Sequence, residues 1–289
     1  MKIKTAGAGA GKTTNLVDDI LVANENKKNG KHIFVLAYSN YARKIITQKL
    51  IEIMGELPSD IHVTTIHSFF YNQIIDPYYY LLYDKQFNEI SNQKLPSKPE
   101  FKSAILKSLR DSSGIIHVEE FSRFAKLVVK GKSGDLKHVK EVRSDINEKI
   151  TGYLSCIFID EAQDMNRETS EVFSKLDEFG IDVNLIGDVN QDLHNRKAFS
   201  SLVDENKDCV TFIPENYRCP ASHVLLSNHF ISENQLSKSG KNGELLYCLE
   251  SKIDILNFIK WQIARNNLNK FSNADHAKRS QSVFANLNI

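Results

Sequence analysis

The strongest chemical pattern in the chain is a glycine-rich segment at its start. Residues 6–13 read AGAGAGKT, which has the spacing of a phosphate-binding loop with alanine at the first glycine position. Glycines let successive backbone N–H groups curl around a phosphate, and the dipole of the following helix adds to the attraction. The lysine would reach the β- and γ-phosphates of a nucleotide, and the threonine hydroxyl would bind Mg²⁺. We therefore expect a nucleotide site made of Ala6, Gly7, Ala8, Gly9, Ala10, Gly11, Lys12, Thr13 and Thr14.

An acidic pair supplies a second chemical feature. Asp160 and Glu161 directly follow the apolar run Cys156–Ile159. A carboxylate at the end of a buried strand can hold Mg²⁺, and the next one can orient and deprotonate an attacking water. Taken alone, an acidic pair after a strand is a common surface feature, but downstream of a phosphate loop it indicates metal-assisted phosphoryl transfer. We expect Asp160 and Thr13 to be the metal ligands and Glu161 to be the general base.

Three short apolar runs must position these residues: Ile33–Ala37, Cys156–Ile159 and Val183–Ile186. Each is followed by polar or glycine-containing turns and then by helical periodicity, which is the pattern of buried parallel strands joined by crossover helices. Ligands of such open α/β sheets bind beyond the carboxyl ends of the strands. We therefore predict an α/β fold in which the chemical motifs share one edge of a parallel sheet.

The predicted sheet is interrupted once. Residues 73–145 have an aromatic opening and then helical periodicity over Phe101–Leu109 and around Val118–Val129. This pattern predicts a mainly helical insertion between two strands. The core domain would then consist of residues 1–72 and 146–225.

Residues 226–289 are expected to begin a further domain. A helix is predicted over Ala221–Phe230, a strand over Glu244–Leu249 and another helix over Lys252–Arg265. The polar stretch Asn266–Ile289 has weak periodicity, so we expect it to be loosely ordered.

Composition narrows the class of protein. The 37 basic and 36 acidic residues almost cancel, so net charge neither requires nor excludes a nucleic-acid partner. The four cysteines lie far apart without a CxxC pair, which is typical of reduced thiols rather than of a disulfide framework or a zinc site. No apolar stretch approaches the roughly 20 residues that span a bilayer, and no signal peptide is apparent. We expect a cytoplasmic protein without a membrane partner.

Six segments, in order along the chain, resemble the motifs of UvrD/Rep-type superfamily 1 DNA helicases. They are AGAGAGKT at residues 6–13, AYSNYA at 37–42, TIHS at 65–68, DEAQD at 160–164, GDVNQDL at 187–193 and ENYR at 215–218. Six ordered motifs are far more specific than any one of them. The resemblance implies a RecA-like fold for the core, ATP and Mg²⁺ as cofactors, and single-stranded or partly duplex DNA as the partner.

The resemblance also implies roles for individual residues. Gln163 and Gln191 would sense the γ-phosphate and couple it to DNA, Arg218 would contact that phosphate, and Tyr217 would stack on adenine. The chemistry agrees, because a guanidinium neutralises charge that develops during phosphoryl transfer and an aromatic ring suits a purine face. The structural alternative is a core tyrosine beside a surface ion pair. The catalytic residues would be Glu161, Gln191 and Arg218.

A second set of residues would contact DNA by the same resemblance. Tyr38 would stack on a base, Asn40 and Thr65 would hold phosphates, and His67 would bond to a backbone oxygen. Where relatives often carry an aromatic residue after the GDxxQ segment, this chain has HNRKAF, and Arg196 would stack or bind phosphate instead. Isolated tyrosines and histidines are more often packed or solvated, so that alternative stays open. The DNA-binding candidates are Tyr38, Ser39, Asn40, Thr65, His67 and Arg196.

The sequence therefore predicts an ATP-dependent DNA helicase-type protein that moves 3′ to 5′, a direction implied by the resemblance. The motifs cover the first RecA-like domain and only the beginning of a second, and no upstream glutamine motif is present, so nucleotide selectivity would rest largely on Tyr217. We expect the isolated chain to bind Mg-ATP, hydrolyse it poorly and unwind no duplex unless a partner completes the site. Two alternatives remain: an ATP- or DNA-sensing regulatory subunit of a nuclease or defence complex, and an inactive truncated helicase.

Overall fold

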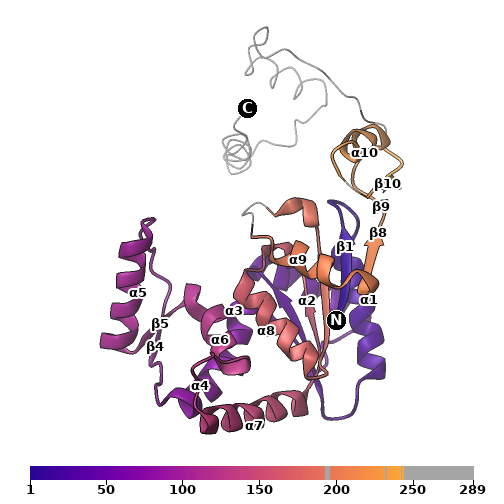
Figure 1. The fold of residues 1–289 in the computed structure, drawn as a ribbon. Coiled ribbons are helices and arrows are strands. Elements are labelled where there is room, and N and C mark those ends of the chain that lie inside the picture. Colours follow the sequence, from indigo (N-terminus) through magenta and orange to yellow (C-terminus); the bar gives the residue numbers. More distant parts are fainter. Residues whose placement is uncertain (193–195, 232, 242, 244–289) are drawn as a thin grey trace. The chain divides into compact units, whose positions relative to one another are not determined.

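A six-stranded parallel sheet forms the core of the part of the chain that the structure describes (Figure 1). The computed structural model describes residues 1–192, 196–231, 233–241 and 243. The predicted α/β fold is confirmed, and the three predicted strands are all in this sheet. In spatial order the strands are β3 (Ile61–Thr65), β2 (His32–Ala37), β6 (Leu154–Ile159), β7 (Asp182–Gly187), β1 (Lys2–Ala6) and β8 (Val210–Ile213).

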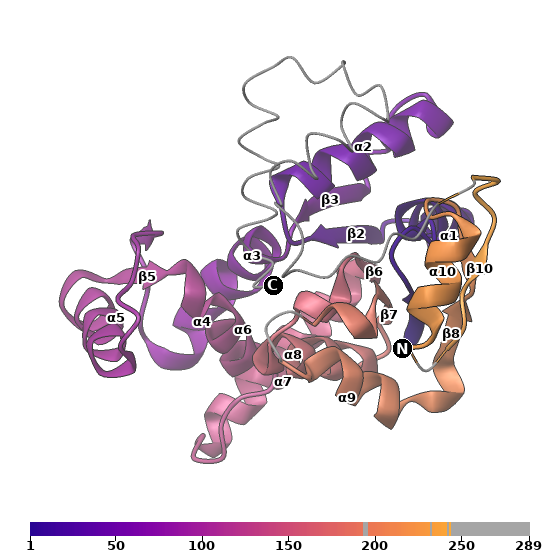
Figure 2. The same ribbon diagram turned by 90° about the horizontal axis from the view of Figure 1, so that it is seen from above.

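Strands β2 and β6 are mostly apolar runs because both faces of the sheet are buried there. Alternate side chains of β2 point to opposite faces: Ile33 and Val35 pack in one apolar cluster, and Phe34 and Leu36 pack in the other. Helices α1 (Lys12–Asn26) and α2 (Asn40–Met54) supply the first cluster with apolar residues from their buried sides. On the other face lie α8 (Arg167–Glu178), α9 (Ala198–Glu205) and the segment between β3 and β6 (Figure 2).

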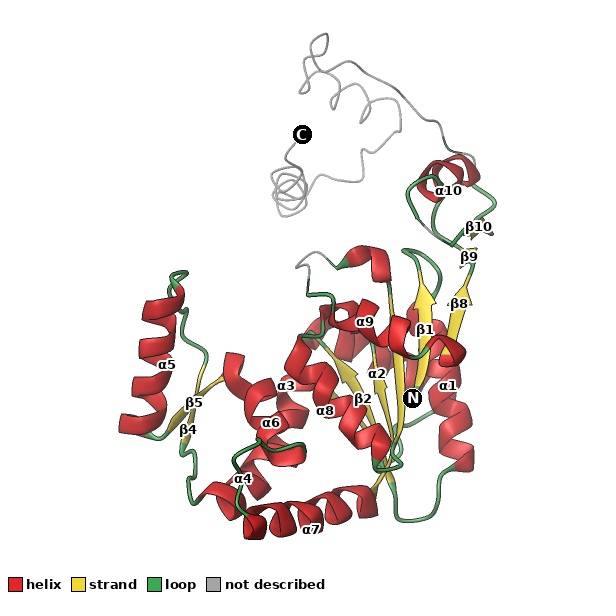
Figure 3. Ribbon diagram, in the orientation of Figure 1, coloured by secondary structure: helices red, strands yellow, loops and turns green. Residues whose placement is uncertain are grey.

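The segment between β3 and β6 is mainly helical and runs over residues 66–153, whereas the helical insertion was predicted over residues 73–145. Its helices are α3 (Ile66–Phe69), a π-helix (Phe70–Ile75), α4 (Asp76–Tyr83), α5 (Pro99–Ser113), α6 (Phe121–Val129) and α7 (Lys137–Tyr153). The predicted helices over Phe101–Leu109 and Val118–Val129 correspond to α5 and to a short 3₁₀ turn followed by α6. Two strands were not predicted, β4 (Glu89–Ser91) and β5 (Ile115–His117), because three-residue strands are too short to show a period (Figure 3).

A buried ion pair holds this helical segment together. Arg143 on α7 and Asp135 are both buried, and the Arg143 Nη2 atom lies 2.6 Å from Asp135 Oδ2. Arg143 also donates to the Tyr83 hydroxyl at 3.0 Å and to the carbonyl of Val128 at 3.1 Å. Burial works against the charged form of Asp135, but the backbone N–H of Lys132 and the guanidinium hold the pKa of this carboxyl below its usual value. The charges of Arg143 and Asp135 are therefore compensated only while both residues and their hydrogen-bond partners are present.

Replacing Arg143 by methionine should lower the free energy of unfolding by about 3–5 kcal/mol, because the carboxylate of Asp135 would stay buried without its partner. Chemical denaturation measures the change. The matched control is Lys140→Met, an exposed position on the same helix, which should change the unfolding free energy by about 0.5 kcal/mol or less. Equal losses for the two variants would contradict a structural role for the pair.

After β8 the chain continues beyond the carboxyl edge of the sheet and contacts the loop that follows β1 (Figure 1). It forms β9 (Glu215–Asn216), α10 (Ala221–Asn228) and β10 (Leu236–Ser237), and β10 pairs with β9. The predicted helix over Ala221–Phe230 is confirmed, although it ends at Asn228. The predictions for Glu244–Leu249, Lys252–Arg265 and Asn266–Ile289 lie outside the described residues.

Two further sequence expectations concern membranes and thiols. Among the described residues, no helix has the length and apolar character needed to cross a membrane. Cys156, Cys209 and Cys219 are free thiols, and Cys248 lies outside the described residues.

Candidate nucleotide-binding site

The phosphate loop connects β1 to α1. β1 ends at Ala6 and α1 begins at Lys12, so the loop runs from the carboxyl end of a central strand to the amino end of a helix. Gly9 has φ 85° and Gly11 has φ 75°, the left-handed region in which glycine is favoured. These two residues curl the backbone so that N–H groups at the helix start can face an anion. The loop therefore has the shape that a nucleotide phosphate needs.

The acidic pair lies at the carboxyl end of β6 and faces the lysine of the loop. The Lys12 ammonium is 3.8 Å from Glu161 Oε2. Asp160 is 4% exposed. Its burial, and to a smaller extent the nearby charge of Glu161, raise the pKa of its carboxyl to about 6. A buried carboxyl beside a second carboxylate is stabilised in its charged form by a divalent cation. The residues present therefore fit a bound Mg²⁺.

A hydrogen-bonded chain joins the acidic pair to the end of β7. The Gln163 side chain donates to Glu161 Oε2 at 2.7 Å and accepts the backbone N–H of Asp188 at 3.0 Å. The Asp188 carboxylate in turn accepts from Gln191 Nε2 at 2.6 Å. The structure thus brings together Glu161, Gln163 and Gln191. Asp188 belongs to the same network, but sequence reasoning assigned it no role although it stands inside the GDVNQDL segment.

The segment that carries the candidate adenine and γ-phosphate contacts lies beside the loop. The backbone N–H of Tyr217 donates to the carbonyl of Gly9 at 2.9 Å. The Tyr217 side chain is 58% exposed, and its ring is 3.8 Å from the place of a Cβ on Gly11, so a ring face is open next to the loop. The Cβ atom of Arg218 packs against Gly9. The alternative of a core tyrosine does not describe this geometry.

Three polar residues near the loop were not predicted from the sequence. Lys49 on α2 donates to Thr14 Oγ1 at 3.1 Å, although nothing in the spacing of an amphipathic helix marks this lysine. Asn216 and Gln235 are buried against the loop itself. Asn216 stands inside the ENYR segment, so a signal existed for it. Gln235 lies in a polar stretch that carries none.

The DNA-binding candidates lie at the ends of β2 and β3 and after β7. Ser39 and Thr65 cap the helices that follow, since their side chains accept the N–H groups of Ala42 and Ser68. Asn40 and His67 are exposed, and desolvation by nearby atoms lowers the pKa of His67, which favours a neutral ring. The list is completed by Arg196, an exposed residue whose guanidinium donates to the carbonyl of Asp164.

Tyr38 is half-buried at the end of β2. Its ring packs against the apolar cluster that contains Phe34 and Leu36, and its hydroxyl is buried without a hydrogen-bond partner among the described residues. Burial raises the pKa of this hydroxyl well above its ordinary value. The exposed ring of the same segment is that of Tyr41, which is 75% exposed in the first turn of α2.

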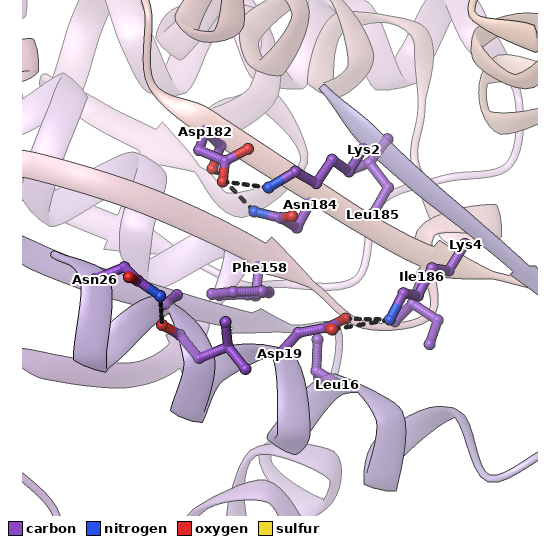
Figure 4. A pocket seen from close by; sticks show the side chains of 12 residues that line it. Lys2, Lys4, Leu16, Asp19, Asn26, Phe158, Asp182, Asn184, Leu185 and Ile186 are labelled. Carbon is purple, nitrogen blue, oxygen red and sulfur yellow. Dashed lines mark hydrogen bonds and ion pairs between the residues drawn. The ribbon is translucent and has the colours of Figure 1, made fainter. Parts of the chain in front are cut away.

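A cavity of about 220 Å³ lies under α1, away from the loop (Figure 4). The charged groups in its wall are paired: Lys2 with Asp182 at 3.0 Å and Lys4 with Asp19 at 2.6 Å. No residue of the phosphate loop lines it. These features make it a gap in the packing of α1 on the sheet rather than a nucleotide site.

Comparison with known proteins agrees with this site. Residues 1–196 match the family described as AAA domain, and the matched region contains the phosphate loop, the acidic pair and the network at the end of β7. Domains of this family occur in UvrD/Rep-like helicases and related P-loop NTPases. No curated protein matches the chain. The matched region and the geometry within it show that this chain belongs to the AAA domain family of P-loop NTPases.

Proposed function

We propose that this chain is an ATP-driven, UvrD/Rep-like DNA motor of the 3′-to-5′ helicase type. The observation that carries the proposal is a shared edge: the loops after β1, β6 and β7 and the polar ends of β2 and β3 all lie at the carboxyl edge of one parallel sheet. A nucleotide at that edge would lie next to the candidate DNA contacts. A conformational change caused by loss of the γ-phosphate would therefore reach the candidate DNA contacts over a short distance.

On this proposal, Mg-ATP is held by groups that already face the loop. The backbone N–H groups between Gly7 and Thr13 and the ammonium of Lys12 would bind the phosphates. Thr13 and Asp160 would hold Mg²⁺, which supplies charge neutralisation during phosphoryl transfer. The open ring face of Tyr217 would stack on adenine.

Hydrolysis would depend on Glu161 and on two side chains that follow the γ-phosphate. Glu161 would take the proton of the attacking water, and Gln163, which already donates to it, would keep the carboxylate in place. Gln191 would respond to the γ-phosphate through Asp188. Arg218 would neutralise charge on the transferred group.

Contacts to DNA would come from the ends of β2 and β3. Ser39, Asn40 and Thr65 would bind phosphates, and the exposed ring of Tyr41 would offer a stacking surface besides that expected of Tyr38. His67 would donate or accept a hydrogen bond as a neutral ring. Arg196 would add a positive charge at the same edge.

Replacing Tyr41 and His67 together by alanine should weaken binding of a single-stranded oligonucleotide by about tenfold or more, since stacking on one ring is worth about 1–3 kcal/mol per base. Fluorescence anisotropy at two salt concentrations measures this, and affinity should fall as salt rises, with little dependence on sequence. Tyr80→Ala is the matched control, because that ring is 51% exposed but lies on α4. Equal affinity of the double variant and the control would remove the stacking site.

Three assays on the purified chain test the function as a whole: ATP binding, ATP turnover with and without single-stranded DNA, and separation of duplexes with a 3′ or a 5′ tail. Slow turnover that single-stranded DNA stimulates would support a motor that needs a partner to complete its site, and unwinding from the 3′ tail would show that the chain also acts alone. Binding of both ligands with no effect of DNA on turnover would instead favour an ATP- and DNA-sensing protein. A chain that binds no Mg-ATP would rule out both.

A further inference from the structure

A later part of the chain, from β9 to β10, contacts the phosphate loop through its side chains and backbone and forms a cover over one side of it. Figures 1 and 2 show where β9, β10 and α10 lie relative to β1 and α1. Asn216 ends β9 and is 3% exposed, and Gln235 precedes β10 and is 7% exposed. Asn216 Nδ2 donates to the carbonyl of Ala8 at 2.8 Å and to Gln235 Oε1 at 2.9 Å. One buried amide therefore ties the loop to a second buried amide.

These bonds set the direction of the loop's N–H groups. In a trans peptide the carbonyl and the N–H point in opposite directions. The carbonyl of Ala8 is held by Asn216, and the carbonyl of Gly9 is held by the backbone N–H of Tyr217 at 2.9 Å. The N–H of Gly9, in the same peptide as the Ala8 carbonyl, is thereby turned away from this cover, as a bound phosphate requires. The N–H of Ala10 donates to the carbonyl of Gly7 at 3.2 Å, which closes a turn within the loop.

Gln235 also explains the glycine at position 7. Gly7 does not have positive φ, so its backbone alone would accept a side chain. The amide nitrogen of Gln235 occupies the place that a Cβ on Gly7 would take. Gln235 is itself fixed, because Asn228 bonds both its N–H, at 2.9 Å, and its carbonyl, at 3.0 Å.

Asn216 also bonds to the backbone of Arg218, the candidate γ-phosphate contact. Its Oδ1 atom accepts the backbone N–H groups of Arg218 at 3.1 Å and of Cys219 at 2.9 Å. The same side chain therefore orients the phosphate loop and the backbone that carries the arginine. Gln235 makes no such bond to Arg218, so its influence falls on the loop.

We propose that Asn216 and Gln235 are positioning residues that hold the phosphate loop in its phosphate-binding shape before the nucleotide arrives. The inference rests on the proposed function, because it concerns the same ATP site. Its physical content is preorganisation: a loop that is ordered on folding does not have to be ordered on binding. Gln235 acts on nucleotide affinity, and Asn216 acts on affinity and, through Arg218, on turnover.

A double-mutant cycle on Gly7 and Gln235 tests the inference. Gln235→Ala should raise the Kd and KM for Mg-ATP by about threefold to tenfold, the range for the loss of one or two hydrogen bonds, with kcat within about twofold. Gly7→Ala should do the same by displacing the Gln235 amide. The double variant should bind Mg-ATP no more weakly than the single variant with the lower affinity, because either change alone already removes the contact between Gly7 and Gln235. Gln235→Met serves where the alanine variant does not fold.

The control is Asn147→Ala, which removes a similarly buried amide that bonds the carbonyl of Val129 on the helical segment. It should lower Tm without changing KM. A wild-type affinity for Mg-ATP in Gln235→Ala, or fully additive losses in the double variant, would overturn the inference while leaving the nucleotide site in place. Absence of Mg-ATP binding by the wild-type chain would instead overturn the proposed function.

Discussion

Replacing Lys12 by alanine is expected to lower the affinity for Mg-ATP by well over tenfold, which corresponds to more than about 1.4 kcal/mol. Lys12 is the first residue of α1, and its side chain is only 12% exposed at the mouth of the loop. Its ammonium would face the β- and γ-phosphates. The loss would exceed that of one contact, because the charge of Glu161, now 3.8 Å from the ammonium, would no longer be balanced and would repel the phosphates.

Isothermal titration calorimetry measures this affinity directly. Lys2→Ala is the matched control: it removes a lysine from β1, at the far end of the strand, where an exposed ion pair with Asp182 should contribute little. Lys49→Ala should have an intermediate effect, since this lysine contacts Thr14 rather than the loop. Unchanged affinity in Lys12→Ala would mean that the glycine-rich segment is not the phosphate site.

The fold of the core could be predicted because its strands are long enough to show a pattern. Ile33–Ala37 and Cys156–Ile159 are buried on both faces, and uninterrupted apolar runs are the direct result, whereas the half-buried Asn184 interrupts Val183–Ile186. The candidate site followed from the same fact, since parallel strands end at one edge. The strands β4 and β5 could not be predicted, because their pairing depends on contacts far apart in the sequence.

Tyr38 shows how the parity of a strand limits what a motif predicts, and its stacking role stays a prediction. Side chains of a strand alternate between faces, so Tyr38 continues the row of Phe34 and Leu36 into the apolar cluster. The residue that leaves the sheet is Tyr41, on the helix that follows. Applying the period of two beyond the end of the apolar run would have separated the two tyrosines.

The two residues that cover the phosphate loop could not be predicted from the sequence for a different reason. Asn216 and Gln235 are separated by 19 residues, and their contact depends on the turn that α10 makes between them. No period of two or 3.6 residues encodes such a meeting. Gly7 gave an indirect signal, but a glycine in a phosphate loop is already explained by the loop, so its contact with a distant glutamine could not be read from the sequence.

Replacing Glu161 by glutamine should separate binding from hydrolysis. The variant keeps the shape of the side chain and should bind Mg-ATP near normally, but it cannot accept the proton of water. Turnover is expected to fall at least about a hundredfold, the low end for loss of a general base. Phosphate release under saturating ATP measures turnover, and calorimetry measures affinity on the same preparation. Glu148→Gln, an exposed carboxylate on α7, controls for the change in net charge.

The backbone and the side chain of Glu161 are both held in place. Glu161 has φ 53°, which is unusual for a residue with a side chain, and Gln163 holds its carboxylate at 2.7 Å. A backbone held in this way, next to the carboxyl of Asp160, indicates that the position of Glu161 matters more than its charge alone. Asp160→Asn should therefore behave differently, weakening metal-dependent binding as well as turnover, because it would remove a ligand of Mg²⁺. If Glu161→Gln and Asp160→Asn lose affinity equally and keep equal turnover, the two carboxylates do not divide the work as proposed, and the base lies elsewhere.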